Sequence, residues 1–287
     1  MAIIVNPISP AAFSIAGFAV RWYALAYVAA FVVGFYLLKL LADKTPRSVN
    51  SKKFFDDLFT AVVLGVIIGG RLGYVLFYNL PFFIKHPLEI IAVWNGGMSF
   101  HGGLLGVMLA TFFVARKECA KYKMQSANKG ENENSSLLFA LCSLDLLAVV
   151  TPIGLFFGRI ANFINMEVMG RETTRPWGVV FSGTGDLTPR HPSPLYEAAL
   201  EGLLLFVIMF CLWKFTKLKE RAGALSGIFA VLYAVFRIFA EQFRAPDAQL
   251  GFLTSWGLTM GQLLSAAMLV AGAAIFAIAM RKKISDC

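Results

Sequence analysis

Seven runs of mostly apolar residues follow one another along the 287-residue chain, separated by shorter polar segments. Each run reaches the roughly 20 residues that a helix needs to cross a bilayer. They lie at Phe18–Leu41, Leu58–Tyr78, Ile90–Ala115, Leu137–Phe157, Tyr196–Phe215, Ala224–Phe243 and Leu258–Met280. The pattern predicts an all-α integral membrane protein with about seven transmembrane helices, organised as a single polytopic membrane domain over residues 1–287.

Composition and charge agree with this prediction and argue against a nucleic-acid partner. Hydrophobic residues make up 58% of the chain and charged residues 15%, which is typical of a polytopic membrane protein. The net charge of +9 arises mainly in alternate loops and the C-terminal segment, which together hold 17 of the 26 Lys and Arg residues. Because Lys and Arg concentrate in cytoplasmic loops, we expect the N-terminus outside and the C-terminus in the cytoplasm.

The longest segment expected on the outer side covers residues 158–194. It is rich in Gly and Thr, and Gly178–Phe181 has the composition of a short strand. Long connecting segments in compact folds are often functional, so we expect a small extracytoplasmic cap here. The arginines in and near this segment are interpreted as anchors to lipid headgroups, namely Arg171, Arg175, Arg190 and Arg244.

Polar side chains continue the fourth apolar run without a break, from Gly158 to Gly170. If the stretch is helical, Arg159 and Asn162 share a face, and Asn165 comes next along it. A guanidinium beside amide donors suits a phosphate. The alternative is a polar cap where a helix leaves the bilayer, and the spacing alone leaves both interpretations open.

A histidine framed by glycines interrupts the third apolar run at Trp94–Gly103. Glycines on both sides of His101 disfavour a helix, and non-helical backbone at membrane depth is tolerated where it is buried or lines a cavity. We therefore expect a re-entrant turn that presents His101 to a cavity. Histidine can take a proton near neutral pH, although a lone histidine is more often a hydrogen-bonded core residue.

The sixth apolar run carries a stripe of polar residues at helical spacing, Tyr233, Arg237, Glu241 and Arg244. An unpaired arginine within apolar sequence is costly, so Glu241, one turn away, is the expected partner of Arg237. One interpretation is a structural ion pair. The other is an arginine directed at a phosphate or at charge that develops on it.

Several further polar residues receive structural interpretations. Tyr23 opens the first run, where aromatic residues commonly anchor at the interface. Ser193 and Pro194 suit the cap and first turn of a helix, so the His191–Glu197 motif is interpreted as structural. Asp145 is a lone carboxylate and a candidate partner for an arginine, whereas Arg71, within Gly69–Tyr74, has no assigned role.

The pattern Gly-Arg-x-x-Asn-Phe-x-Asn-x-Glu-x-x-Gly at residues 158–170 resembles the signature of the prolipoprotein diacylglyceryl transferases. The Ser99–Gly103 stretch and the Arg237–Glu241 pair are similar to motifs of the same family, in the same order. Two positions depart from the family pattern: Ala161 stands where glycine is usual, and Pro194 where glutamine is usual.

The resemblance implies a transferase of the bacterial cytoplasmic (inner) membrane. Such an enzyme moves a diacylglyceryl group from phosphatidylglycerol to the lipobox cysteine in a prolipoprotein signal peptide, forming a thioether and releasing glycerol phosphate, as the first step of lipoprotein maturation. The implied catalytic residues are Tyr23, His101, Arg237 and Glu241. The implied substrate-binding residues are Arg159, Asn162, Asn165, Glu167, Gly170 and Arg237.

Neither a metal nor a soluble cofactor is expected, because no His/Cys/Asp cluster has the spacing of metal ligands. Two other classes compete with the transferase. A lipid or anion transporter would use buried arginines as a binding site, and inverted repeats would favour it. An intramembrane protease would need a Ser/His or paired-Asp arrangement within its spans.

Overall fold

The computed structural model describes residues 3–5, 8–9, 11–15, 18–45, 52–93, 96–125, 135–246, 251–255 and 257–281, and these are mostly helical. Trp94 and Asn95 of the glycine-framed motif lie outside the described residues. The α-helices are α1 (Trp22–Ala42), α2 (Lys52–Tyr78), α3 (Leu80–Lys85), α4 (Phe100–Gln125), α5 (Ser135–Ile164), α6 (Ser193–Glu197), α7 (Leu205–Phe215), α8 (Ala224–Ala240) and α9 (Met260–Arg281).

Shorter elements connect these helices. The 3₁₀ turns are η1 (Pro87–Ile91), η3 (Ser182–Thr184) and η5 (Lys217–Glu220), and a π-helix, η4 (Ala198–Leu204), joins α6 to α7. The strands are β1 (Ile3–Val5), β2 (Ala11–Ile15), β3 (Phe18–Arg21) and β4 (Val179–Phe181).

Within the described residues, five helices are long and apolar enough to cross a membrane: α1, α2, α5, the continuous α6–η4–α7 segment and α9. This confirms an all-α membrane protein. Helix α8 is apolar but has 17 residues, short of a full span. Helix α4 has 26 residues, but it carries His101 and glycines at its start and basic residues from Arg116 onward, which lower its hydropathy.

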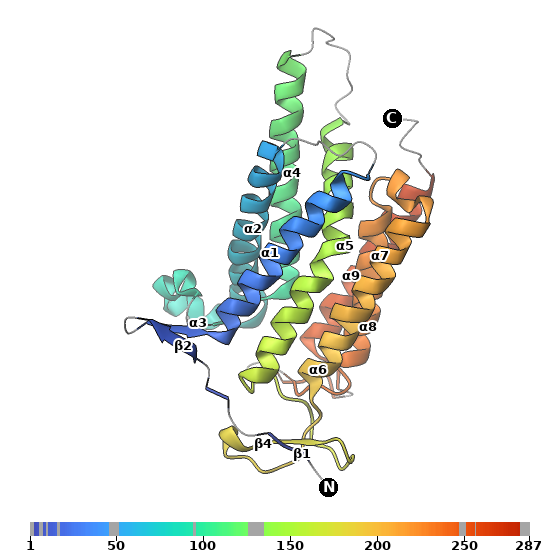
Figure 1. Ribbon diagram of the computed structural model, residues 1–287. Coiled ribbons are helices and arrows are strands. Elements are labelled where there is room, and N and C mark those ends of the chain that lie inside the picture. The colour runs from blue at the N-terminus through green and yellow to red at the C-terminus, as the bar shows by residue number, and fades with distance from the viewer. Residues whose placement is uncertain are drawn as a thin grey trace.

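The long helices run side by side, with α5 at the centre of the bundle (Figure 1). Helix α5 contacts α1, α4, α6, η4, α7 and α8, while α2 packs on α4 and α8 packs on α9. Glycines bring both outer pairs unusually close. A Cβ on Gly69 would lie 2.4 Å from the Gly102 carbonyl oxygen, and one on Gly227 would lie 2.9 Å from that of Gly272.

The strands and the segment between α5 and α6 gather at one end of the bundle, at the bottom of Figure 1. Strand β4 confirms the predicted strand at Gly178–Phe181. It pairs in parallel with β1, with Ile3 opposite Val179. Strands β2 and β3 form an antiparallel hairpin that leads directly into α1. The last turn of α9 lies near the opposite end of the bundle from β1 (Figure 1).

Candidate functional site

Helix α5 presents Arg159 and Asn162 near its end, at the strand-bearing end of the bundle. The helix ends at Ile164, and Asn165 comes directly after it, where its amide still donates to the Ala161 carbonyl at 3.0 Å. Arg159 contacts two glutamates of the next span. Its Nε lies 3.0 Å from Glu197 Oε2, and its Nη2 lies 3.4 Å from Glu201 Oε2.

Glu197 and Glu201 stand on α6 and the π-helix η4, and their side chains are fully buried. Glu197 also contacts Arg237 Nη1 at 2.7 Å and Arg244 Nη1 at 3.5 Å. The His191–Glu197 motif, interpreted as structural, thus contributes a buried carboxylate that is shared between arginines. It lies next to π-helical backbone, which is frequent at functional sites, so we include Glu197 in the candidate site.

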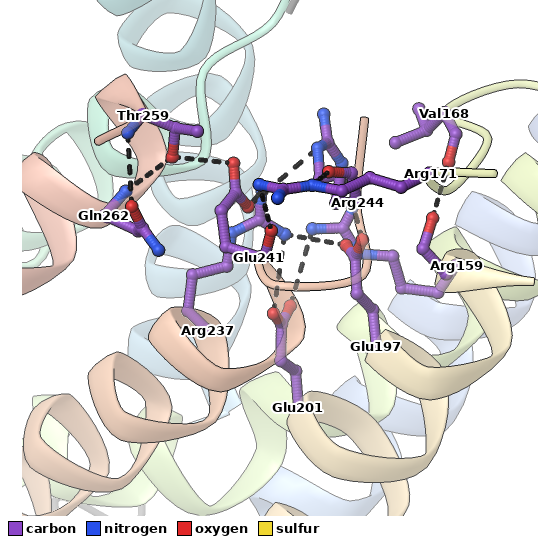
Figure 2. A network of polar contacts seen from close by, with 11 residues as sticks. Arg159, Val168, Arg171, Glu197, Glu201, Arg237, Glu241, Arg244, Thr259 and Gln262 are labelled. Carbon is purple, nitrogen blue, oxygen red and sulfur yellow. Dashed lines mark hydrogen bonds and ion pairs between the residues drawn. The ribbon is translucent and has the colours of Figure 1, made fainter. Parts of the chain in front are cut away.

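Arg237 bridges α6 to the end of α8. Its Nη2 lies 2.9 Å from Glu241 Oε2, as the sequence predicted, and its Nη1 also reaches Glu201 Oε1 at 3.5 Å. Thr259 donates a hydrogen bond to Glu241 Oε1 at 3.0 Å. Figure 2 shows these side chains converging from α6, η4 and α8.

Three arginines and three glutamates thus form one buried arginine–glutamate cluster: Arg159, Arg237, Arg244, Glu197, Glu201 and Glu241. Their formal charges cancel. Such a balance is expected at membrane depth, because a buried charge without a partner is strongly destabilising. Seven ion-pair contacts join the three arginines to the three glutamates, at least two for each guanidinium, so the N–H groups are oriented before any ligand arrives.

Three of the four arginines interpreted as headgroup anchors have protein partners instead. Arg244 belongs to the cluster. Arg171 donates to the carbonyl oxygens of Arg244 and Glu241, at 3.0 and 3.4 Å. Arg190 pairs with Asp186 at 2.9 Å. Arg175 is exposed, with its guanidinium carbon 5.9 Å from the centroid of the Trp177 ring.

Asn162 joins the first helix to the segment that follows α5. Its Nδ2 donates to Tyr23 Oη at 3.4 Å and to Glu167 Oε2 at 3.2 Å, and Asn165 Nδ2 lies 3.5 Å from Glu167 Oε1. The residues on both sides of Glu167, Met166 and Val168, have positive φ angles of 55° and 58°. Such angles cost energy for non-glycine residues and cluster at functional sites.

Gly170 ends this segment in a tightly packed position. A Cβ there would lie 2.3 Å from the His191 carbonyl oxygen and 2.6 Å from that of Phe243. The Gly170 amide donates to the His191 carbonyl at 3.1 Å, and Ser193 Oγ donates to the Val168 carbonyl at 3.0 Å. The predicted capping role of Ser193 is therefore wrong. Pro192 precedes α6, and the Ser193 hydroxyl ties the Glu167 segment to this helix.

A cavity of about 420 Å³ opens beside the cluster, between α1, α2, α4, α5 and α8. Its polar lining includes Tyr23, His101, Arg159, Asn162, Arg237 and Arg244. Its apolar lining follows one face of α1, from Tyr27 to Leu38, and continues on facing residues of α2, α4 and α5. Of the predicted site residues, Asn165, Glu167, Gly170 and Glu241 are not among the residues that line it.

His101 lies in the first turn of α4 and lines this cavity, in agreement with the predicted exposure to a cavity. Residues 96–99 before it are not helical, and Gly96 and Gly97 have φ angles of 83° and 77°. The Nε2 atom of His101 is buried and has no hydrogen-bond partner within the described part of the chain. A ring nitrogen in this state can exchange a proton with a bound ligand.

Asp145 does not pair with an arginine. Its carboxylate accepts hydrogen bonds from the Gly223 amide at 2.8 Å and from the Ser226 amide and hydroxyl, both at 2.7 Å. These groups begin α8, so Asp145 caps this helix from the neighbouring α5. A carboxylate is favourable there because the first amides of a helix lack partners within the helix.

The fold and site together define a class: a polytopic α-helical membrane protein with a mostly apolar cavity that also exposes arginines and a histidine. Residues 10–278 match the family model of prolipoprotein diacylglyceryl transferase, and the chain belongs to this family. The prediction made from the signature is thereby confirmed.

Relatives in three bacteria are similar over nearly the whole chain, and each is named phosphatidylglycerol–prolipoprotein diacylglyceryl transferase. The protein of Rhodospirillum rubrum is 47% identical over 96% of this chain and 94% of its own length. That of Azospirillum brasilense is 48% identical over 98% of both chains. That of Paramagnetospirillum magneticum is 47% identical over 96% of this chain and 95% of its own.

Proposed function

We propose that this chain transfers the diacylglyceryl group of phosphatidylglycerol to the lipobox cysteine of a prolipoprotein, releasing glycerol phosphate. One observation carries the proposal, in a chain of this family: a single cavity combines an apolar lining along α1 with an end lined by Arg159, Arg237 and His101. An anionic lipid needs both surfaces, and a thiol nucleophile needs a proton acceptor beside them.

The lipid fits the cavity in one orientation. Its acyl chains lie along the apolar face of α1 between Tyr27 and Leu38, which at 1.5 Å per residue spans roughly 16 Å. Its phosphate lies against Arg159 and Arg237. Because the glutamates already neutralise these arginines, the phosphate is recognised by oriented N–H donors rather than by an excess of positive charge.

The thiol then attacks the glycerol carbon next to the phosphate. The S–C bond forms as the C–O bond to the phosphate breaks, and the electron pair of that bond leaves on the phosphate oxygen. His101 takes the thiol proton, since its Nε2 is without a partner in the described structure, and gives it up to solvent or to the leaving group. Arg237, oriented by Glu241, stabilises the charge that develops on the phosphate.

The remaining predicted residues act on either side of this centre. Tyr23 and Asn162 line the cavity and hydrogen-bond to each other, so they contact the polar part of the lipid. Glu167 accepts hydrogen bonds from the side chains of Asn162 and Asn165, so it orients the Asn162 amide. Gly170 contributes through its backbone, because any side chain there would collide with two carbonyl groups.

The same proposal includes seven spans, with α4 and α8 added to the five long apolar helices, in one membrane domain over residues 1–287. Residues 158–194 form the extracytoplasmic cap, and the protein lies in the bacterial inner membrane with its N-terminus outside and its C-terminus in the cytoplasm. The distribution of Lys and Arg supports this orientation. So does the position of β1 and the last turn of α9 near opposite ends of the bundle (Figure 1).

Cysteine labelling of intact cells tests the orientation. In a variant without the four native cysteines, a membrane-impermeant maleimide should label a cysteine placed at Arg175 and spare one placed at Lys121. Labelling at Lys121 and protection at Arg175 would reverse the proposed topology.

The function is tested with purified protein, phosphatidylglycerol labelled in its acyl chains, and a lipobox peptide. Mass analysis of the peptide should show a diacylglyceryl thioether on the cysteine, and a peptide with serine at that position should stay unmodified. Lipid movement across vesicles without modification of cysteine would indicate a transporter, and a cleaved peptide would indicate a protease.

A further inference from the structure

Arg71 of α2 is a buried arginine that the proposed reaction does not use. Its side chain donates to five main-chain carbonyl groups: Glu89 at 2.6 Å, Ile90 at 3.0 Å, Ala92 at 3.1 Å, Gly97 at 3.2 Å and Gly96. Two of these residues, Glu89 and Ile90, lie in η1, and the other three lie between η1 and α4. One guanidinium thus holds the backbone that leads to His101.

The neighbours of Arg71 hold the next residues of the same segment. The Gly70 carbonyl accepts the Ser99 amide at 2.8 Å, and Ser99 Oγ accepts the Gly102 amide at 3.3 Å, within the first turn of α4. Gly97 has a positive φ, and a Cβ on it would lie 2.5 Å from the Tyr74 ring and 3.0 Å from Arg71 Nη1. This segment therefore fits α2 in one conformation.

The residues just after His101 are fixed by the same helix. A Cβ on Gly102 would lie 2.4 Å from the Gly69 carbonyl oxygen, and one on Gly106 would lie 2.1 Å from that of Gly65. Backbones this close leave no room for α4 to rotate or slide on α2. His101 thus stands between a segment that Arg71 holds and a helix turn that packs directly on α2.

We propose that Arg71 is a positioning residue for His101. It acts through the main-chain carbonyl groups that it holds at residues 89, 90, 92, 96 and 97; this inference rests on the proposed transferase function. The imidazole has no hydrogen-bond partner at Nε2 in the described structure to orient it, so its place relative to the thiol depends on its backbone. Arginine suits this task because its planar group offers five donors in fixed directions, whereas lysine offers three on a flexible stem.

The test is Arg71→Lys, alone and combined with His101→Gln, in purified protein that carries out the transfer. Arg71→Lys keeps the charge but cannot reach all five carbonyls, so turnover should fall by about tenfold to a hundredfold while the KM for phosphatidylglycerol stays unchanged. In the His101→Gln background the same substitution should have no further effect, because the imidazole it positions is gone.

Two further variants make the result decisive. Arg221→Lys is the matched control: Arg221 also donates to a main-chain carbonyl, that of Met280, but it lies between η5 and α8, away from the cavity. It should leave turnover and KM unchanged. Gly97→Ala displaces the same segment without removing a charge. If Arg71→Lys does not fold, Gly97→Ala replaces it in the test and should show the same loss of turnover.

The positioning role would be wrong if Arg71→Lys lowered turnover equally with and without His101, or if it changed KM instead of turnover. Neither result would contradict the proposed transferase function. Near-normal turnover of His101→Gln would overturn the positioning role as well. A wild-type protein that fails to modify the lipobox peptide would instead remove the proposed function itself.

Discussion

The two sides of the cavity hold their polar groups by opposite means. In the arginine–glutamate cluster, side chains fix one another through ion pairs. The single residue Glu197, for example, contacts three arginines: Arg159, Arg237 and Arg244. On the α2–α4 side, His101 has a buried ring nitrogen without a partner in the described structure, and close backbone packing holds the residues around it.

The difference follows from what each side has to do. A charged group at membrane depth needs opposite charge or carbonyl oxygens beside it, and in the cluster the contacts that neutralise each arginine also orient it. A proton acceptor works only if its nitrogen is not already occupied, so its position has to come from the main chain. Substitutions in the cluster should therefore affect folding and activity together, whereas a substitution of His101 should affect activity alone.

The largest effect is expected for Glu197→Gln. It leaves buried arginines with one negative charge too few, which should lower the free energy of unfolding by about 3–5 kcal/mol and the thermal midpoint by about 10 °C. Thermal unfolding of the purified protein in detergent measures this shift, and transfer should be lost with it.

Glu172→Gln is the matched control for this substitution. Glu172 also pairs with an arginine, Arg190 at 3.5 Å, but its side chain is 69% exposed. An exposed pair contributes no more than about 1 kcal/mol. Equal shifts for the two variants would mean that the cluster does not depend on charge balance, and the contrast between the two sides of the cavity would fail.

The second prediction concerns the other side. His101→Gln keeps a polar side chain of similar reach but removes the basic nitrogen, so transfer should fall by about a thousandfold. The thermal midpoint and the binding of phosphatidylglycerol should stay at wild-type values. A lower midpoint would show that the ring supports the fold, and near-normal transfer would place the base elsewhere, for example on the substrate phosphate.

The apolar pattern located the long helices, because helices in lipid have to be apolar over most of their length. Their bounds were less accurate where polar residues continue a helix: α5 extends seven residues beyond the predicted Phe157, and α4 begins and ends ten residues later than the predicted run. The Arg237–Glu241 pair was also predictable, since the residues lie one turn apart on the same helix. The signature stretch was recognised by its resemblance to a family, and its first residues, through Ile164, are helical.

The partners across helices could not be predicted in this way. Spacing shows that Glu197 and Glu201 share a face, but it does not show that this face meets Arg159, about 40 residues earlier, on α5. The same limit explains Asp145, which caps a helix that begins 78 residues later. A signal was nevertheless present: two glutamates one turn apart within an apolar run require positive partners, and unpaired arginines were available.

The third prediction separates the two arginines that face the phosphate. Arg159→Lys should mainly raise the KM for phosphatidylglycerol, because Arg159 stands beside Asn162 at the end of α5 and binds the headgroup before reaction. Arg237→Lys should mainly lower turnover at saturating lipid, because Arg237 responds to charge that develops as the phosphate leaves. Each loss should be roughly a hundredfold.

Turnover measured against lipid concentration in nanodiscs distinguishes these outcomes. Both arginines contact Glu197 and Glu201, so a shared change is the natural competing result. Identical profiles for the two variants would mean that Arg159 and Arg237 bind one phosphate together. The separate roles proposed for them, in lipid binding and in turnover, would then be wrong.

The smallest effect is expected for an arginine–carboxylate pair in the segment between α5 and α6. Asp186 accepts the Thr188 amide at 2.9 Å and two N–H groups of Arg190, at 3.1 and 2.9 Å. The hydrogen bonds from Thr188, and then Arg190, lower the pKa of Asp186 from 3.8 to about 2. This pair is partly exposed to water, with side-chain exposures of 38% for Asp186 and 22% for Arg190. An ion pair should therefore contribute much less here than at the fully buried Glu197.

Asp186→Asn should therefore leave turnover unchanged and lower the thermal midpoint by no more than about 2 °C at neutral pH.

The sign of the pH dependence is set by the lowered pKa. The carboxylate stabilises the folded state fully above about pH 5, where it is ionised in both states, and this contribution is lost as the pH falls through 3.8 toward 2. The midpoint difference between wild type and variant should stay constant from pH 7 to about pH 5 and close below pH 4. A difference that persists at pH 2 would show that the shape of the amide, and not the charge of Asp186, is responsible. A large difference at neutral pH would place this exposed pair alongside the buried cluster in energy, and burial could then no longer explain the contrast with Glu197.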